Sequence, residues 1–425
     1  MSDPTIFISA GEASGEHYGA MLIDELRNQL AAHRRKVNFV GMGGSRMVDA
    51  GLQQIVRSED MAVMGITEVV RHLPRIYREY RKLKTAIRAH RPDIAILIDF
   101  PDIHFKLAEE FHRLGIPVIF FVSPQLWAWK KHRIKLVQKY VDKMLVIFPF
   151  EEHFYREHGV EVEFVGHPLA DLPLPEISRE QFARECGLNP SRSWIGLLPG
   201  SRAKEIGDNL PQMLAAARIL TLRGPRGAGS RKEFEYIIPQ APTLNASQRK
   251  MLAGVVKHHG DGLPVQLVDD ARATLLHARA SIVASGTATV QAAVIGNPFV
   301  VVYKVSPLTF LLAKRLVHYP LEIWPPNDLN AHGNLPIGMV NLIAGRRIVP
   351  ELIQQQFTAA NVAAGLRPLL EDTPERVRMT ADLAEVRRRL TPDSALTPIQ
   401  RVAQAVEDLL RQPVSSEGRI SSASV

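Results

Sequence analysis

Strand-length runs of apolar residues recur along the first half of the chain, separated by longer amphipathic segments. The runs occupy residues 5–10, 37–40, 94–98, 118–122 and 144–148. Runs that carry almost no polar residue are typical of strands buried on both faces of a sheet. Buried strands that alternate with helices, such as the one predicted at residues 19–30, indicate a parallel sheet with right-handed crossovers.

The same pattern begins again after a proline-rich connector at residues 166–175. Further strand-sized runs lie at residues 195–198, 236–238, 265–267, 281–284 and 299–303. The sequence therefore predicts an α/β protein with two Rossmann-like domains whose parallel sheets face each other across a cleft. We expect the domains at residues 1–171 and 172–350, C-terminal helices at 351–412 and a disordered tail at 413–425.

Charge and cysteine content narrow the choice of partner and compartment. The 425 residues include 52 Lys and Arg against 44 Asp and Glu, a net charge of +8. This balance favours an anionic partner such as nucleic acid, an acidic lipid headgroup or a phosphorylated substrate. The single cysteine, Cys186, allows no disulfide within the chain, which fits a reducing cytoplasm. We find no signal peptide and no apolar run long enough to span a bilayer, so we expect any membrane contact to be peripheral.

Residues 61–91 combine apolar residues at helical spacing with many cations and few acids. The residues predicted to contact an anionic membrane or an acyl chain are Val63, Ile66, Val69, Val70, Leu73, Arg71, Arg75 and Arg78. The alternative is an ordinary surface helix that packs its apolar face inward. The density of cations favours the lipid interface.

Two acidic residues lie in the turn after the first strand, at the edge where open parallel sheets bind ligands. Residues 11–16 place Glu12 and Glu16 beside glycines that let a ligand approach the backbone. The alternative is a plain strand–helix turn capped by Ser14. The two carboxylates favour a functional turn.

Two more carboxylates, Asp99 and Asp102, follow the buried run at residues 94–98. Asp102 is positioned to act as a general base. The alternative is that Asp102 caps the helix predicted at residues 104–114. Both roles remain open for these two aspartates.

Turns suited to a phosphate follow two strands of the second half. Ser201 begins a helix after residues 198–200, and Arg202 adds a cation that Glu205 could orient. The turn at residues 284–289 brings Ser285, Gly286 and Thr287 to another helix start. Either turn alone could be a capped helix start, but two in one domain favour a nucleotide site.

Other polar and aromatic residues allow less specific interpretations. Trp127 and Trp129 lie beside lysines. Either one packs in the core and the other lies on the surface, or both line an acyl or sugar groove. His167 stands alone, as structural histidines usually do. No spacing of Cys and His residues predicts a metal site, and no nucleic-acid motif accompanies the basic charge.

Taken in order, these motifs resemble those of the lipid-A-disaccharide synthases over roughly residues 5 to 350. They are residues 11–15, 62–66, 122–124, 127–129, 149–151, 165–167, 198–202, 284–287, 312–316 and 341–345. The resemblance implies a GT-B fold and an inverting glycosyltransferase of lipid A biosynthesis. Its substrates would be UDP-2,3-diacylglucosamine and 2,3-diacylglucosamine 1-phosphate, and its products lipid A disaccharide 1-phosphate and UDP. It further implies no cofactor, a homodimer with swapped C-termini, and a peripheral position at the inner face of the inner membrane.

The residues supply a mechanism consistent with this resemblance, which we state as expected roles. Asp102 would accept the proton of the acceptor 6-hydroxyl, and Glu12 would share the catalytic centre while holding the sugar with Ser14. The remaining substrate-binding residues would be Gly11, Gly15, Ser201, Arg202, Ser285, Gly286, Thr287, Gln291 and Asn341. The family has Asp at position 16 and Glu at position 291, and residues 318–336 are additional sequence.

Two other functions remain open on the sequence alone. A UDP-sugar epimerase of the same fold would act on soluble substrates and would not need the basic apolar patch at residues 61–91. A non-catalytic, membrane-associated protein that binds nucleotide or lipid is suggested by the departures at Glu16 and Gln291. Asp102 and Arg202, both present, favour the enzyme.

Overall fold

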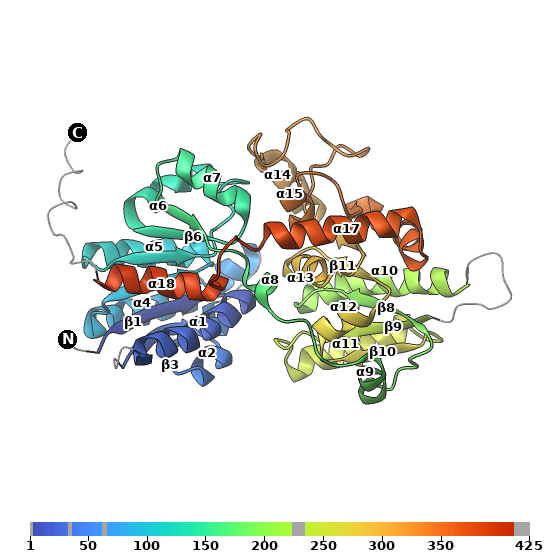
Figure 1. The fold of residues 1–425 in the computed structure, drawn as a ribbon, viewed down its shortest axis with the longest axis horizontal. Helices are drawn as coiled ribbons and strands as arrows, with labels where there is room; N and C mark the ends of the chain where they lie inside the picture. Colours follow the sequence, from blue (N-terminus) through green and yellow to red (C-terminus); the bar gives the residue numbers. More distant parts are fainter. Residues whose placement is uncertain (1–2, 33–35, 62–65, 223–233, 412–425) are drawn as a thin grey trace. The chain divides into compact units, whose positions relative to one another are not determined.

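The computed structural model describes residues 3–32, 36–61, 66–222 and 234–411, apart from the side chains of residues 66–72. The chain forms two compact α/β units (Figure 1). The first unit comprises Met1–Asp171 and Leu390–Val425, and the second comprises Leu172–Arg389. The predicted α/β architecture with two parallel sheets is confirmed.

The first unit is built on a seven-stranded parallel sheet with the order β3-β2-β1-β4-β5-β6-β7. Its strands are β1 (Thr5–Ala10), β2 (Asn38–Gly43), β3 (Leu52–Arg57), β4 (Ile94–Ile98), β5 (Val118–Phe121), β6 (Lys143–Val146) and β7 (Val162–Phe164). Its helices are α1 (Ala13–Ala32), α2 (Ser45–Asp49), α3 (Ser58–Met61), α4 (Ile66–His90), α5 (Pro101–Arg113), α6 (Ile134–Tyr140), α7 (Pro149–Glu157), α8 (Pro168–Asp171) and α18 (Pro398–Arg411), with a 3-10 turn at Lys131–Arg133.

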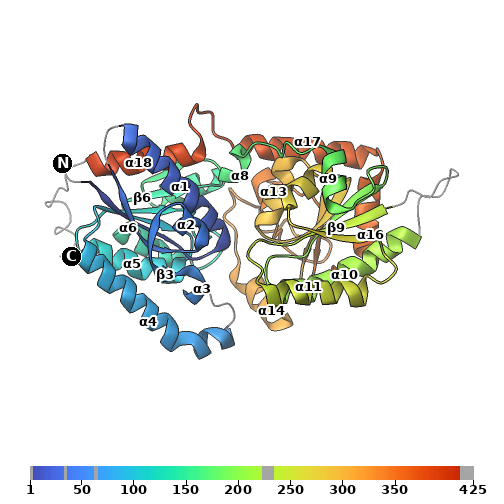
Figure 2. The same ribbon diagram turned by 90° about the horizontal axis from the view of Figure 1, so that it is seen from below.

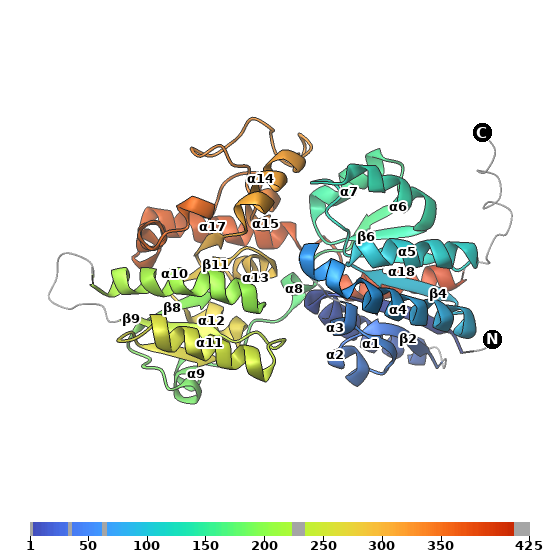
Figure 3. The ribbon, with the colours of Figure 1, turned by 180° about the vertical axis from the view of Figure 1, so that it is seen from behind.

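Helices cover both faces of this sheet, which explains why β4 can be apolar throughout. Helices α1 and α18 lie in front of the sheet in Figure 1, and α4 and α5 lie over its other face in Figure 3. Every residue of β4 is buried as a result. The strand order reverses between β1 and β4, which pair in parallel. Ligands of open α/β sheets bind beside the carboxyl ends of strands at such a reversal.

The second unit repeats this plan with a six-stranded parallel sheet in the order β10-β9-β8-β11-β12-β13. Its strands are β8 (Ser193–Leu198), β9 (Phe234–Pro239), β10 (Val265–Val268), β11 (Ala280–Ala284), β12 (Phe299–Tyr303) and β13 (Glu351–Ile353). Its helices are α9 (Arg179–Cys186), α10 (Ala203–Leu222), α11 (Ala246–His259), α12 (Ala271–His277), α13 (Thr287–Ile295), α14 (Pro307–Leu316), α15 (Met339–Ala344), α16 (Ala359–Leu366) and α17 (Pro374–Arg389), with 3-10 turns at Gln354–Gln356 and Arg367–Leu370.

This second sheet is also a middle layer. Figure 2 shows α10 and α11 on one face and α13 and α17 on the other. Here the strand order reverses between β8 and β11, which pair in parallel. The two turns predicted to bind phosphate follow these two strands.

The strands that the sequence did not predict all lie at sheet edges. They are β3, β7 and β13, which end the two strand orders. Edge strands are half solvated and lack the continuous apolar run of a central strand. The expectation that residues 351–412 are helical throughout is wrong at β13, where Glu351–Ile353 pairs with β12.

The C-terminal helices are divided between the two units. Helices α16 and α17 belong to the second unit, whereas α18 packs against α1 of the first unit. Ile399, Val402 and Val406 form the buried stripe of α18. The predicted tail at residues 413–425 lies outside the described residues. Within the described parts of the chain, no helix is both long enough and apolar enough to cross a bilayer.

Candidate active site

The turns after β1 and β4 bring two carboxylates together at the reversal of the first sheet. Glu12 lies between β1 and α1, and Asp99 follows β4 directly. The negative charge of Glu12 acts on Asp99, so the two groups share one electrostatic environment. The sequence predicts that both turns lie at the carboxyl ends of strands, where ligands bind, but it favours Asp102 over Asp99 as the general base.

The turn that carries Asp99 has an uncommon backbone. Asp99 and Phe100 are consecutive residues in the left-handed region, with φ of 52° and 54°. Residues with side chains rarely adopt this conformation, and two in succession at a sheet edge indicate a turn held by its surroundings. Gly11 provides part of that hold, because a Cβ at this position would collide with the Phe100 ring. The sequence gives no signal for this strain.

Asp99 is a stronger base than an ordinary aspartate. Burial raises its pKa to about 6, with a further rise from the negative charge of Glu12 and an opposing backbone hydrogen bond at Phe100. Burial, and the nearby charge of Asp99, also raise the pKa of Tyr18 on α1. A carboxylate with a pKa near the working pH is suited to general-base catalysis.

Asp102 has a different environment. Its side chain is 70% exposed, and it pairs with Arg133 at 2.6 Å and with Lys130 at 4.0 Å. It lies in the first turn of α5, whose N-cap is Phe100 and makes no side-chain capping bond. The capping alternative for Asp102 is therefore wrong. The aspartate instead places a negative charge at the positive end of the helix dipole.

Gly15 and Glu16, in the turn after β1, have structural roles. Gly15 lets α1 approach β4, since a Cβ there would lie 3.3 Å from Ile98. Glu16 accepts a hydrogen bond from the backbone N–H of Arg46 at 3.0 Å, at the start of α2. Ser14 is half-buried in the first turn of α1. Glu16 is therefore a capping residue, and its departure from the family pattern does not touch Asp99.

The tryptophan motif divides between core and surface. Trp127 is buried and donates from its indole nitrogen to Glu151 at 3.1 Å, whereas Trp129 is 42% exposed beneath Lys130. Glu151 also accepts from Ser123 and from the backbone N–H of Phe148, at 3.1 Å each. Burial raises the pKa of Glu151 to about 7 against these hydrogen bonds. This network ties the end of β5 to the start of α7.

His167 is a structural histidine. It is buried, and its Nδ1 accepts a hydrogen bond from the backbone N–H of Leu169 at 3.2 Å. Burial lowers its pKa to about 3, so the ring is neutral at physiological pH. It packs edge-on against Tyr18.

In the second unit, the turn after β8 exposes a serine and an arginine at a helix start. Gly200 has a φ of 116°, which a side chain would strain. Glu205 accepts from the backbone N–H groups of Ser201 at 3.0 Å and Arg202 at 3.4 Å, and its other oxygen pairs with the Arg202 guanidinium at 3.0 Å. A carboxylate thus already occupies N–H donors of the kind that bind phosphate oxygens.

The turn after β11 is more open. Gly286 is the N-cap of α13 with a φ of 148°, and a Cβ at this position would meet nothing within 4 Å. Thr287 is exposed and Ser285 is half-buried. Gln291 lies half-buried one turn further along α13. The start of this helix can therefore admit a charged group without displacing a side chain.

Asn341 does not belong to this surface. It is fully buried, and its amide donates to Val349 at 3.1 Å and to Glu351 at 2.9 Å. Its oxygen accepts from the backbone N–H groups of Ile348 at 2.7 Å and Val349 at 3.0 Å. An Asn side chain offers two donor hydrogens and two acceptor positions, so none is left for a sugar. The geometry gives Asn341 a structural role and does not support its predicted substrate contact.

Each unit carries an exposed helix with apolar and basic residues. On α4, Leu73 is 57% exposed and Arg75 and Arg78 are exposed, while Pro74 is accommodated within the helix. Val63, and the side chains of Ile66, Val69, Val70 and Arg71, lie outside the described residues. On α14, the exposed leucines recur at i, i+3, i+4 and i+8 and are Leu308, Leu311, Leu312 and Leu316. Lys314 and Arg315 occupy its last turn.

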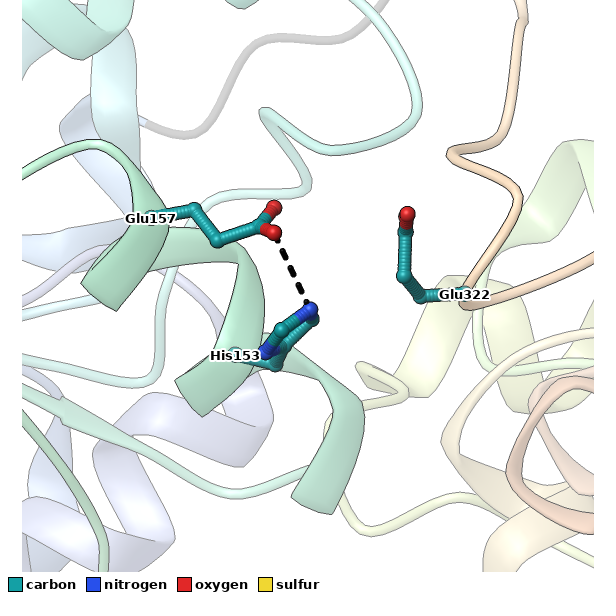
Figure 4. A group of neighbouring side chains, drawn as sticks. All are labelled: His153, Glu157 and Glu322. Carbon is teal, nitrogen blue, oxygen red and sulfur yellow. Dashed lines mark ion pairs between the residues drawn. The ribbon is translucent and has the colours of Figure 1, made fainter.

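His153 and Glu157 on α7 form an ion pair with an N–O distance of 3.2 Å, which is the dashed line in Figure 4. Both side chains are more than half exposed, and the residues are one helical turn apart. This spacing is that of an ordinary surface pair, which contributes little to stability.

Comparisons with known proteins agree with the motifs. The family model described as lipid-A-disaccharide synthetase matches residues 6–396. The chain is 54% identical to the lipid-A-disaccharide synthase of Acidobacterium capsulatum, over 97% of this chain and 98% of that protein.

Solved structures with low sequence identity share the fold. The glycotransferase of kitacinnamycin aligns with a TM-score of 0.59 at 13% identity, covering 96% of this chain and 99% of that one. The UDP-GlcNAc 2-epimerase from Neisseria meningitidis aligns with a TM-score of 0.55 at 12% identity, covering the same shares of the two chains. Because a transferase and an epimerase align with similar TM-scores, the fold leaves the reaction open and the family decides it.

Proposed function

This chain belongs to the lipid-A-disaccharide synthetase family, and from that membership we infer its reaction. It is a glycosyltransferase that condenses UDP-2,3-diacylglucosamine with 2,3-diacylglucosamine 1-phosphate. The products are UDP and lipid A disaccharide 1-phosphate. The linkage changes from alpha in the donor to beta in the product, so a single displacement inverts the anomeric carbon.

The acceptor 6-hydroxyl must lose its proton as it attacks, and the first unit supplies the base. Asp102, the base that the sequence favours, remains a candidate, and its exposure leaves it accessible. Its carboxylate is, however, already engaged by Arg133 and Lys130, so an acceptor hydroxyl would have to compete with these two cations for it. Burial and the negative charge of Glu12 make Asp99 a stronger base than an ordinary aspartate, because they raise its pKa to about 6. We therefore assign the proton to Asp99, with Glu12 beside it, and a supporting role to Asp102.

The departing UDP gains negative charge, and the second unit supplies its stabilisation. Arg202 and the helix starts at Ser201 and at Ser285–Thr287 are suited to the pyrophosphate. Glu205 would have to release the N–H groups of Ser201 and Arg202 as a phosphate takes its place. Gln291 is the candidate for the ribose hydroxyls, as a neutral donor and acceptor.

Peripheral binding to the inner face of the inner membrane completes the proposal. The substrates carry acyl chains. Helix α4 exposes Leu73 and Tyr77, and α14 exposes several leucines, in each case beside basic residues. Helices of this kind bind anionic lipid surfaces. We also propose that the protein acts as a homodimer without a cofactor, following the resemblance.

The observation that carries the assignment of roles is the contrast between Asp99 and Asp102, which are three residues apart. The test is product analysis after mixing the purified protein with both substrates in detergent, for the wild type, Asp99→Asn and Asp102→Asn. We expect disaccharide from the wild type and a loss of kcat of about 10²–10⁴-fold for Asp99→Asn, the usual contribution of a positioned base. Asp102→Asn should lose about tenfold or less, because its charge is exposed.

Each alternative function has its own outcome in this assay. If the wild type binds UDP but forms no disaccharide, the transferase assignment fails and the non-catalytic binder is favoured. An isomerised UDP-sugar in place of disaccharide would indicate the epimerase. If Asp102→Asn loses far more activity than Asp99→Asn, the roles of the two aspartates are reversed.

A further inference from the structure

His104 on α5 lies directly behind the turn that carries Asp99, and the reaction assigned above does not use it. The side chain is fully buried. Its Nδ1 is 2.5 Å from the backbone oxygen of Asp99, and its Nε2 is 2.8 Å from the hydroxyl of Ser9. Ser9 is a fully buried residue of β1, three positions before Glu12. One imidazole therefore joins the two segments that carry the two carboxylates.

The direction of both hydrogen bonds follows from their partners. A backbone carbonyl can only accept, so Nδ1 must carry a hydrogen and donate to Asp99. Burial lowers the pKa of His104 to about 3, so the ring is neutral. Nε2 is then unprotonated and accepts from the Ser9 hydroxyl. Both ring nitrogens are satisfied with no charge, as a buried histidine requires.

The hydrogen bond from His104 to the carbonyl of Asp99 is made at a turn whose backbone conformation is unfavourable. Asp99 and Phe100 both have left-handed φ values, and strained turns persist when the surrounding structure holds them. The Phe100 ring, also edge-on to His104, fills the space that Gly11 leaves open. His104 holds the same turn from inside through the carbonyl of Asp99. A flexible turn at this place would let the Asp99 carboxyl move away from Glu12 into water.

We propose that His104, anchored by Ser9, is a positioning residue for the base: it fixes the β4–α5 turn against β1 so that Asp99 is held, partly buried, beside Glu12. This inference rests on the proposed function where it concerns turnover, but the positioning itself does not depend on it. The titratable groups that bear on Asp99 are Glu12 after β1, Tyr18 on α1 and His104 on α5. Of these, only Glu12 is charged over the working range of pH, since Tyr18 and His104 stay neutral, so a looser turn changes the charge acting on Asp99 mainly through its distance from Glu12.

The test compares variants that keep one, both or neither of the two hydrogen bonds. His104→Leu removes both, and Ser9→Ala removes only the anchor. His104→Asn places an amide nitrogen near the position of Nδ1 and can retain the bond to Asp99. For each folded variant, kcat and KM are measured against pH in detergent. The Asp99 carboxyl is also titrated by ¹³C NMR, with Asp99→Asn to identify its signal.

Loosening the turn should lower the pKa of Asp99 toward that of an ordinary aspartate, because the carboxyl becomes solvated and moves from Glu12. The acid limb of the kcat profile then moves to lower pH for His104→Leu, by half a pH unit or more. We expect kcat to fall about tenfold while the KM for UDP-2,3-diacylglucosamine changes less than twofold. His104→Asn should restore most of kcat and the position of the limb, and Ser9→Ala should lie between.

A folded His104→Leu variant with the wild-type acid limb and the wild-type Asp99 titration would overturn the proposal and leave His104 a core residue. If His104→Leu does not fold, Ser9→Ala and His104→Asn decide: an unchanged Asp99 titration in Ser9→Ala overturns the proposal, and a lowered one supports it. The NMR titration separates this result from the proposed function. If Asp99→Asn is fully active, Asp99 is not the base, yet a lowered Asp99 pKa in His104→Leu still supports the positioning role.

Discussion

At the reversal of the first sheet, Asp99 is half-buried, its turn is held by His104 and Phe100, and the negative charge of Glu12 acts on its carboxyl. At the reversal of the second sheet, Ser201 and Arg202 are exposed and Gly286 opens onto free space. The backbone plan is the same in both units, since each reversal joins two parallel strands followed by helix starts.

The difference reflects two requirements of one reaction. A carboxylate becomes a stronger base when it is buried and when another negative charge lies nearby. It is therefore best held in a rigid turn that is shielded from water. A pyrophosphate brings its own charge and a shell of water, so its site must be open and must present N–H groups and a guanidinium. The first unit thus raises the pKa of its own Asp99, whereas the second unit presents hydrogen-bond donors to a charged ligand.

The largest test of this comparison is the pH dependence of the wild type. Asp99 must be ionised to accept a proton, and its pKa is raised to about 6. As the pH falls through this value the active form is lost, so kcat should fall about tenfold per pH unit and about 100-fold by pH 4. Steady-state rates in detergent between pH 4 and 8 measure this. Asp102→Asn should keep the same acid limb, and a rate that stays level from pH 7 to pH 5 would remove Asp99 from the proton transfer.

The second test removes the guanidinium of Arg202 from the turn after β8 in the second unit. Arg202→Ala should weaken UDP binding by about 10–100-fold, since a hydrogen bond to a charged group is worth about 1.5–3 kcal/mol. Isothermal titration calorimetry with UDP measures it. Lys204→Ala is the matched control, because Lys204 lies two residues away and its exposed ammonium pairs with Asp208. Equal losses in the two variants would mean that only net charge matters.

A third test concerns the rigidity of the first unit, where Glu151 joins β5 to α7. Burial raises its pKa to about 7 in the folded state, above the ordinary 4.5 of an unfolded chain. The folded state then holds the proton more tightly, so this contribution to stability is complete below pH 4.5 and is lost as the pH rises through 7. The linkage amounts to about 1.5 kcal/mol between pH 5.5 and 7.

Glu151→Gln isolates that contribution, because the amide does not titrate. The variant should be less stable at every pH, since an NH₂ group then faces the Phe148 N–H donor. Its unfolding midpoint in urea should nevertheless decline less than that of the wild type between pH 5.5 and 7. Parallel declines for the two proteins would show that Glu151 does not titrate in this range.

Sequence reasoning succeeded where a pattern has a single structural cause. The continuous apolar runs of β1 and β4 require burial on both faces, and that fixed the parallel sheets and the edge where Glu12 and Asp99 lie. It failed where the cause is three-dimensional. The environments of Asp99 and Asp102 differ because Phe100 turns the backbone between them, and a pattern of residue types carries no φ value.

Asn341 and His104 illustrate the same limit from opposite sides. Asn341 stands in a family motif, yet backbone groups seven and eight residues away and the Glu351 carboxylate take up its hydrogen bonds. His104 stands in no motif, yet it contacts Ser9 across 95 positions of sequence. Contacts of that separation are set by the strand order, which sequence periodicity does not reveal.

The smallest effect concerns the surfaces, where the two units are expected to behave alike. Replacing Val69, Val70 and Leu73 on α4 with serine, or Leu308, Leu311 and Leu312 on α14, removes apolar area that would enter a bilayer. We expect each triple variant to bind vesicles of phosphatidylglycerol and phosphatidylethanolamine about three- to tenfold more weakly, because partial burial of a few side chains contributes a fraction of their full transfer energy. Co-sedimentation with the vesicles measures this, and activity in detergent should be unchanged.

A control replaces Val377 with serine, because Val377 is exposed on α17 and the leucine of that helix, Leu383, is buried. A single exposed apolar residue is ordinary on a protein surface, so this variant should bind as the wild type does. If only the α4 variant loses binding, the membrane contact belongs to the first unit, and α14 is covered by something other than lipid. If neither variant loses binding, the leucines of both helices have another partner, and the basic residues alone cannot account for a peripheral enzyme.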